Sequence, residues 1–226
     1  MNGLGPWIMT QTWEHLLFLH WKMAVHEMAP LLPNEFELDT YQDDAWLTML
    51  PFQVSHQQFH WLPEIPLLLH YWELNVRTYV KYKGQPGVYF FSLDANHPLA
   101  VLGAKAVGLP FRQAKMDIHH EERLVFFNSR RWFGQGTFAV EYEPYSLQSP
   151  VTMGSLDDWL LERYCLFTKM GNWVLRGDIR HEKWKVSGAR VRIKENSASP
   201  LHLKNEPILA HYCNRKKAYI FPFKKV

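Results

Sequence analysis

Runs of aromatic and β-branched residues, several alternating with polar positions, recur along the chain and predict strands. The clearest case is residues 71–82 and 88–93, which flank the turn Lys83-Gly84-Gln85-Pro86-Gly87. A glycine-containing turn between two such runs is typical of a β-hairpin. Similar patterns predict strands at residues 36–41, 45–54, 112–119, 123–127, 136–142, 164–168, 173–181, 183–192, 208–212 and 218–222. Short turns between successive strands favour antiparallel pairing.

Three segments are predicted to be helices. Residues 12–32 carry a broad apolar stripe, begin at Thr12, which can cap a helix, and run into prolines. Residues 97–107 and 155–163 form shorter predicted helices, the second capped by Ser155. Residues 55–69 contain two prolines, so we expect them to be irregular and to cross or cover the core.

The order of these elements predicts an α+β fold that is mainly antiparallel β. We expect the sheet to curl toward a barrel or cone, with the N-terminal helix lying across it. No repeat or low-complexity linker divides the 226 residues, so one domain is expected, with residues 144–154 as the best internal breakpoint. Aromatic residues make up 15% of the chain, and large rings suit a sheet whose interior must be filled.

Charge and cysteine usage narrow the classes of partner. The formal net charge is only +3. The basic runs at residues 215–217 and 224–225 suit a solvated terminal strand, so no nucleic-acid partner is expected. The apolar segment 16–25 is interrupted by polar side chains and is too short to span a membrane. Cys165 and Cys213 lack a nearby partner and predict reduced thiols in the cytoplasm.

Motifs for metals, cofactors and nucleotides are absent from the sequence. His56 and His60 have the spacing of helical metal ligands, yet they lie in the stretch expected to be irregular. Neither a phosphate-binding glycine loop nor a nucleophile elbow occurs, so no cofactor is expected. His181 and Trp184 flank a predicted hairpin turn, where they either pack the turn or form the rim of a pocket.

Three stretches form a signature that spans nearly the whole chain. They are the hairpin at residues 73–80 and 88–95, residues 18–21 with 31–33, and Glu162-Arg163-Tyr164-Cys165. The signature resembles the YqjF-like family of uncharacterised bacterial proteins, which is similar in turn to the acetoacetate decarboxylase superfamily. The resemblance implies an antiparallel β core, coiled or partly closed around an interior pocket, with a few flanking helices.

The resemblance carries over the fold and not the decarboxylation. Acetoacetate decarboxylase works through a lysine that forms a Schiff base with its keto-acid, activated by a neighbouring lysine. The matching place here follows the turn at residues 108–110 and holds Phe111 and Arg112, neither of which can act as a neutral amine. Lys105 and Lys115 lie nearby without an adjacent lysine. A lysine-dependent decarboxylase is therefore the least favoured alternative.

Strand geometry gathers polar residues on the predicted hairpin. Alternate residues of a strand share a face, which aligns a carboxylate, an amide, a guanidinium and a phenol. On the partner strand the same rule puts an aromatic ring, a hydroxyl and a second carboxylate on one face. These candidates for ligand binding are Glu73, Asn75, Arg77 and Tyr79 on the first strand, with Ser92 and Asp94 following Phe90 on the second.

Arg77 is the best candidate to hold an anionic group, because a guanidinium binds a carboxylate through two parallel hydrogen bonds. The alternative is an internal ion pair between Arg77 and Glu73 or Asp94. Glu162 and Arg163 lie between a helix and a strand, where they either form a buried ion pair with the strand core or provide a second charged wall of the pocket.

The expected function is binding of a small organic anion in an interior, aromatic-lined pocket. Catalysis is left open; Glu73, Asp94 or Tyr79 could move a proton, since burial can raise the pKa of a carboxyl toward neutral. The alternative is a non-catalytic structural or partner-binding protein with a filled core. The sequence leaves self-association through sheet edges open.

Overall fold

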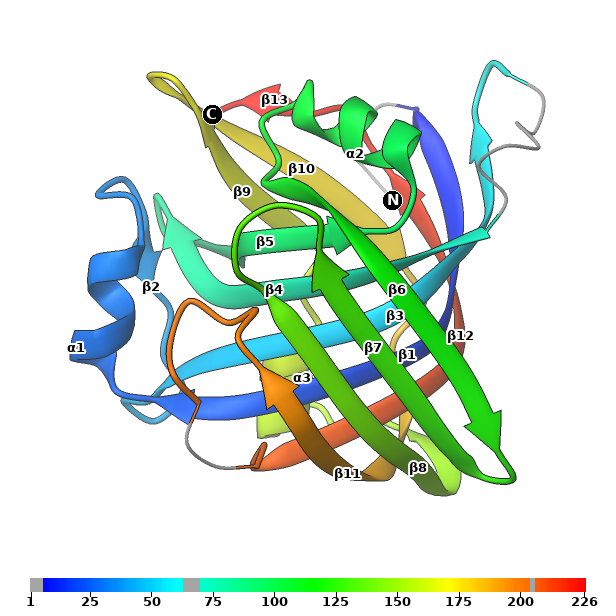
Figure 1. The fold of residues 1–226 in the computed structure, drawn as a ribbon. Coiled ribbons are helices and arrows are strands. Elements are labelled where there is room, and N and C mark those ends of the chain that lie inside the picture. Colours follow the sequence, from blue (N-terminus) through cyan, green and yellow to red (C-terminus); the bar gives the residue numbers. More distant parts are fainter. Residues whose placement is uncertain (1–5, 63–69, 204–205) are drawn as a thin grey trace.

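The computed structural model describes residues 6–62, 70–203 and 206–226 (Figure 1). Within this part of the chain, thirteen strands form one sheet in the order β13-β10-β9-β5-β6-β7-β8-β11-β12-β1-β3-β4-β2. The strands are β1 (Met9–Met23), β2 (Glu37–Leu38), β3 (Ala45–Phe59), β4 (His70–Tyr82), β5 (Gln85–Ala95), β6 (Phe111–Glu121), β7 (Leu124–Arg131), β8 (Thr137–Pro150), β9 (Cys165–Met170), β10 (Trp173–His181), β11 (Lys185–Asn196), β12 (Leu209–Ile220) and β13 (Lys224–Lys225).

The helices are short and lie outside the sheet. They are α1 (Val25–Met28), the 3-10 turn η1 (Ala29–Leu31), α2 (Pro98–Lys105) and α3 (Leu156–Leu161). Helices α2 and α3 lie where the sequence predicts helices, and the Ser155 hydroxyl caps α3 by accepting a hydrogen bond from the Asp158 backbone nitrogen. In the described residues no helix has the length and apolar character needed to cross a membrane.

The sheet closes on itself through two further pairings, β4 with β5 and β10 with β12. Strand β5 pairs in parallel with β9 through its first half and with β6 through its last residues. Every other pairing among the described strands is antiparallel. The fold is therefore α+β and mainly antiparallel, with a curled sheet, as predicted.

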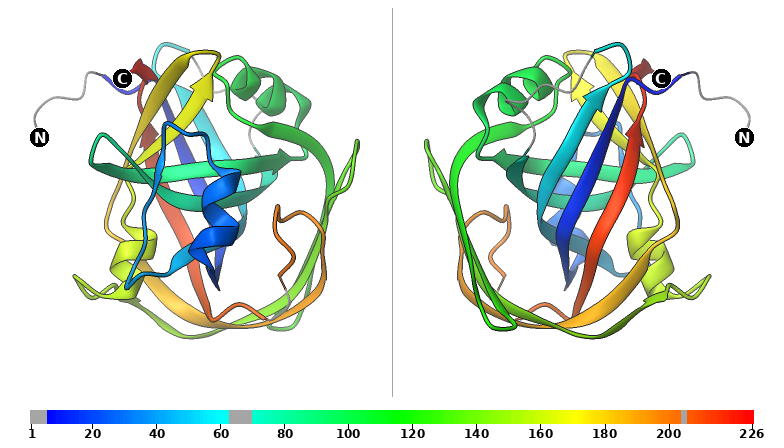
Figure 2. Two further views of the ribbon diagram at one scale, coloured as in Figure 1. Left: turned by 90° about the vertical axis from the view of Figure 1, so that its left-hand side faces the viewer. Right: turned by 90° about the vertical axis from the view of Figure 1, so that its right-hand side faces the viewer.

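The central strands β12, β1 and β3 run side by side (Figure 2, right), and β1 and β3 are buried on both faces over most of their length. On β1, Leu16 and Phe18 join one core, which reaches β9 and Trp184. Leu17 and Leu19 join a second core formed with β7 and β8. Successive side chains therefore all point into apolar surroundings.

This burial explains why the predicted helix over residues 12–32 was wrong. The sequence of a strand that is buried on both faces is a continuous apolar run. Such a run is compatible with either a strand or a buried helix. The segment is instead the strand β1, with an irregularity at His15, whose φ is 54°. Helical structure begins only at α1.

Other boundaries also differ from the prediction. Strand β3 continues to Phe59 through part of the stretch expected to be irregular, and residues 63–69 of that stretch lie outside the described residues. Residues 208–212 and 218–222 belong largely to one strand, β12. Strand β8 runs to Pro150, across most of the expected breakpoint. Cys165 and Cys213 are free and buried, as predicted.

Candidate functional site

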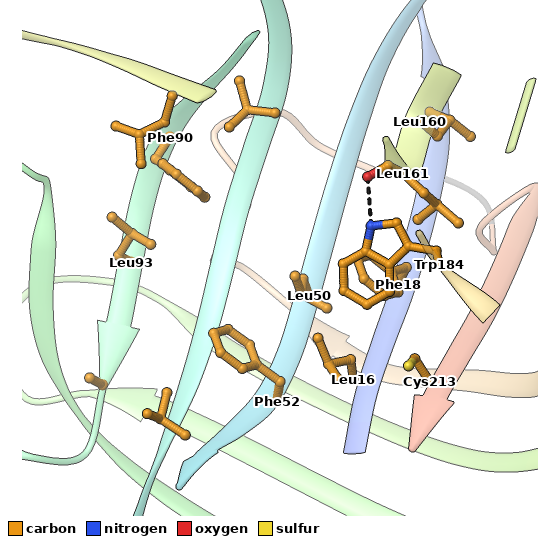
Figure 3. Packing of buried hydrophobic residues seen from close by; sticks show 14 of the residues in the cluster. Leu16, Phe18, Leu50, Phe52, Phe90, Leu93, Leu160, Leu161, Trp184 and Cys213 are labelled. Atoms are coloured by element: carbon orange, nitrogen blue, oxygen red, sulfur yellow. Dashed lines mark hydrogen bonds between the residues drawn. The ribbon is translucent and has the colours of Figure 1, made fainter. Parts of the chain in front are cut away.

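A cavity of about 420 Å³ lies on the β9 and β10 side of the central strands. Its walls include rings from β1, β3 and β5, and helix α2 covers part of it through Ala100 and Ala104. Figure 3 shows Phe18, Phe52 and Phe90 among the packed side chains of this core. The interior of the sheet is therefore hollow at this place and largely apolar.

Trp184 closes one side of the cavity and is fixed in place. Its indole Nε1 donates a hydrogen bond of 2.8 Å to the Leu161 carbonyl oxygen (Figure 3), and its ring meets Phe18 edge-on with centroids 5.0 Å apart. His181 also lines the cavity. Both residues therefore have the pocket position that the sequence left open.

Strand β4 contributes the polar row that the sequence predicted. Glu73, Asn75 and Arg77 all line the cavity. Tyr79 is fully buried beyond them, and its hydroxyl lies 2.7 Å from the Thr48 Oγ1. Three of the four predicted residues therefore line the same cavity, and Tyr79 is buried behind them.

The guanidinium of Arg77 has few partners within the protein. Its Nη2 donates a long hydrogen bond of 3.5 Å to the Leu160 carbonyl oxygen, and its buried Nε has no partner among the described residues. It lies 5.8 Å from the centre of the Phe18 ring. No carboxylate of the described chain pairs with it, so most of its donors remain available to a ligand.

Glu73 is a buried acid at the other end of the row. Burial raises its pKa to about 8, although a hydrogen bond with Tyr71 acts in the opposite direction. At neutral pH the carboxyl is therefore mostly protonated and can donate a hydrogen bond. Burial in an apolar pocket raises the pKa of catalytic carboxyl groups toward neutral for the same reason.

A chain of side-chain hydrogen bonds lies beside Glu73 along the cavity wall. The Tyr71 hydroxyl donates to Gln57 Oε1 at 3.0 Å, and Gln11 Nε2 donates to the same oxygen at 2.9 Å. Trp13 Nε1 donates to Gln11 Oε1 at 2.9 Å. Gln11, Trp13 and Gln57 were not predicted, because β1 and the end of β3 had not been recognised as strands.

Asn75 lies between Glu73 and Arg77 on β4, and its buried Oδ1 has no hydrogen-bond partner in the described structure. The buried Nη2 of Arg163, another lining residue, is also unpaired there. Most buried polar atoms in proteins have a hydrogen-bond partner, so orphaned atoms around one cavity indicate a place for a ligand or ordered water.

Arg163 and Glu162 have mainly structural partners. Arg163 Nη1 pairs with Asp39 Oδ2 at 2.8 Å, and both side chains are buried. Glu162 Oε1 accepts a hydrogen bond of 2.9 Å from the Trp184 backbone nitrogen, and its other oxygen accepts one from the Tyr164 hydroxyl. Arg163 thus forms a buried ion pair, with Asp39 and not with Glu162, and it also borders the cavity.

Ser92 and Asp94 lie on the other face of the hairpin. Arg77 is opposite Phe90 while Val76 is opposite Ser92, which leaves Phe91 as an extra residue. Such a bulge reverses the alternation. The prediction that Phe90, Ser92 and Asp94 share a face was therefore wrong.

Beyond this bulge, Asp94 forms a buried ion pair of 2.7 Å with Arg131, whose Nη2 also donates to the Ser92 hydroxyl at 2.8 Å. Neither Ser92 nor Asp94 lines the cavity. The sequence has no signal for this pair, because it joins residues 37 positions apart on different strands.

Lysines are absent from the described cavity lining. Lys105 and Lys115 are exposed on α2 and β6. Phe111, at the place matched to the decarboxylase lysines, lines the cavity and is buried. An amine that could form an imine with a ligand in this space is therefore not present among the described lining residues.

Comparison with known proteins supplies the family. A family profile, DUF2071, described as an uncharacterized conserved protein (COG2071), matches residues 10–217. The chain belongs to this family. It is 39% identical over 226 residues to the uncharacterized protein YqjF of Bacillus subtilis (strain 168), a match covering 98% of this chain and 93% of that protein. The resemblance inferred from the sequence motifs is confirmed.

Solved structures with the same fold include acetoacetate decarboxylase-like proteins. An acetoacetate decarboxylase-like enzyme from Sphingomonas wittichii RW1 aligns with TM-score 0.67 at 11% identity, covering 100% of this chain and 95% of that chain. The acetoacetate decarboxylase of Legionella pneumophila aligns with TM-score 0.68 at 14% identity, covering 100% and 90%. At these identities the DUF2071 chain shares their fold, and the likeness shows nothing further.

Proposed function

We propose that this chain binds a small organic anion in the interior cavity. The observation that carries the proposal is the guanidinium of Arg77, which borders the cavity without a carboxylate partner among the described residues. An unpaired, partly buried cation is costly, and an anion that accepts two hydrogen bonds from the guanidinium would compensate it. A cavity of about 420 Å³ lies within the usual size of a small-molecule site.

The two ends of the polar row specify the ligand further. A carboxylate would bind at Arg77, while an oxygen acceptor would bind at the protonated carboxyl of Glu73. Four residues of extended strand separate these groups by about 13 Å between their Cα atoms. Between them the ring-lined walls suit an apolar body. The ligand class is therefore a compact monoanion with a second, uncharged oxygen function.

One structural neighbour supports this class. The enduracididine biosynthesis enzyme MppR, solved in complex with pyruvate, aligns with TM-score 0.65 at 7% identity and covers 98% of this chain and 91% of that chain. MppR is thus an example of the same fold holding a small organic anion. Should turnover follow binding here, Glu73 would be the group to give a proton, because Asp94 is engaged by Arg131 outside the cavity.

Native mass spectrometry of the purified full chain, followed by calorimetry with a panel of small 2-oxo, 3-oxo and hydroxy acids, tests the proposal. We expect a co-purifying or added acid to bind. Arg77→Met should weaken that binding by about tenfold or more, the loss typical of a charge-assisted pair. Arg192→Met, which removes an exposed guanidinium on β11, should leave it unchanged.

Two results would contradict it. One is the absence of any bound or binding acid, which favours the alternative of a structural or partner-binding protein. The other is equal binding by wild type and the Arg77→Met variant, which would place the ligand elsewhere.

A further inference from the structure

A second hollow, a groove of about 560 Å³, lies where strands β10 and β12 separate. Their pairing ends at His181 opposite Ala218. Strand β12 meets its next partner on that side, β11, only at Tyr212 opposite Ser187. Between these points β12 is paired only with β1. The sheet is therefore open on one side of residues 213–217, the segment that holds the basic run noted in the sequence.

The groove is strongly cationic. Four cationic residues line it, against the single acidic residue Glu182. Arg215 has a distant partner, with its Nε 3.6 Å from Glu14 Oε1. The other three are Arg180, Lys216 and Lys217, and none of them forms an ion pair with a described carboxylate. The positive charge in the groove is thus largely uncompensated.

Lys216 is the most informative of these residues. It is only 8% exposed although it lines the groove. Its Nζ donates one hydrogen bond of 2.9 Å to the Lys183 carbonyl oxygen and lies 5.0 Å from the centre of the Trp184 ring. Buried ammonium groups are normally paired with a carboxylate. Two remaining donors without a counter-charge indicate that an anion completes the site.

Arg180 and Lys217 are held at the same groove by aromatic rings. The Arg180 guanidinium carbon lies 5.5 Å from the centre of the Phe221 ring, and Lys217 Nζ lies 5.5 Å from that of Tyr219. Both rings also line the groove. Cation–π contacts restrict these long side chains without neutralising them, so the charges are arranged before a ligand arrives.

We propose that this groove is a second binding site, which takes a small, multiply charged anion of the phosphate class. Three uncompensated cations suit a dianion better than a single carboxylate, and guanidinium and ammonium groups both bind phosphate oxygens well. The site is distinct from the interior cavity, although His181 lines both. It does not depend on the function proposed for the cavity.

Calorimetric titration of the full chain with inorganic pyrophosphate, at fixed ionic strength, tests the site. We expect saturable binding that weakens by about tenfold or more in a variant combining Arg180→Gln and Lys217→Gln. A matched control combines Arg123→Gln and Arg192→Gln, which removes the same charge from exposed positions outside the groove. The control should bind pyrophosphate like the wild type.

Amide chemical shifts locate the anion independently. Residues 180–182 and 215–219 should shift on titration, and Arg77→Met should leave pyrophosphate affinity unchanged. No binding up to about 10 mM overturns the proposal, since weaker association would be no more than a general attraction between charges. Equal affinity in the groove variant and its control, or shifts confined to the cavity, would also overturn it.

Discussion

Glu73 and Arg77 line one cavity from the same face of β4, and no ion pair joins these two described side chains. The extended strand separates their Cα atoms by about 13 Å, which keeps the acid from neutralising the cation. One group is therefore mostly uncharged at neutral pH and the other is charged without a counter-ion. This separation leaves both available to a ligand.

The first prediction concerns Glu73 and pH. Burial raises its pKa from an ordinary 4.5 to about 8, so between these values the folded protein binds a proton that the unfolded chain has lost. Stability must therefore fall as pH rises through this window. Glu73→Gln removes this titration. Between about pH 5 and pH 8 the free energy of unfolding of the variant should therefore fall by a few kcal/mol less than that of the wild type.

Urea unfolding of wild type and variant at both pH values measures the effect. Glu195→Gln, at an exposed position on β11, is the matched control and should follow the wild type. If the Glu73→Gln variant shows the same pH dependence as the wild type, the carboxyl is ionised in the folded protein and the proposed proton donor is lost.

The second prediction contrasts Arg131, which is buried, with Arg77, which is half-buried. Arg131→Met leaves Asp94, whose side chain is fully buried, without its cation, and should cost about 3–5 kcal/mol of stability. Arg77→Met leaves no described carboxylate without its cation and should change stability by less than about 1 kcal/mol. Chemical denaturation compares the two variants directly. A large loss in the Arg77 variant would mean that this side chain holds the fold together and is not reserved for a ligand.

The third prediction concerns two glycines on elements that surround the cavity. A Cβ at Gly87 would lie 2.7 Å from the ring of Phe167, which is buried and cannot move aside, so Gly87→Ala should destabilise by about 1–3 kcal/mol. Gly103, within α2, has no atom within 4 Å of its added Cβ. Gly103→Ala should stabilise the protein by up to about 1 kcal/mol. Thermal unfolding gives both values, and a neutral Gly87→Ala would show that β5 and β9 are less tightly packed than described.

The fourth prediction concerns Schiff-base chemistry. Incubation with pyruvate or acetoacetate followed by borohydride should add no mass to Lys105 or Lys115, because both are exposed and neither lines the cavity. Neither lysine has an adjacent lysine in the sequence, the arrangement that activates the amine of such enzymes. A lysine-dependent decarboxylase treated in parallel is the positive control. A reduced adduct on either peptide would restore the decarboxylase alternative.

Local patterns were sufficient for the hairpin and for its polar row. The alternation along β4 already aligned Glu73, Asn75 and Arg77, because the period of a strand is a property of the backbone. Patterns failed for β1, where both faces are buried and the period disappears. They also failed at the bulge before Ser92, since an extra residue leaves no mark in composition.

By itself, the sequence determined the type of most elements and the family resemblance, because both rest on short-range pattern and residue identity. Only the tertiary structure decided which charges are paired. Arg131 meets Asp94, and Arg163 meets Asp39, across different elements, whereas Arg77 and Lys216 meet no described carboxylate. Pairing depends on which distant segments the sheet brings within a few ångströms of each other. The degree of burial then decides how much free energy an unpaired charge costs.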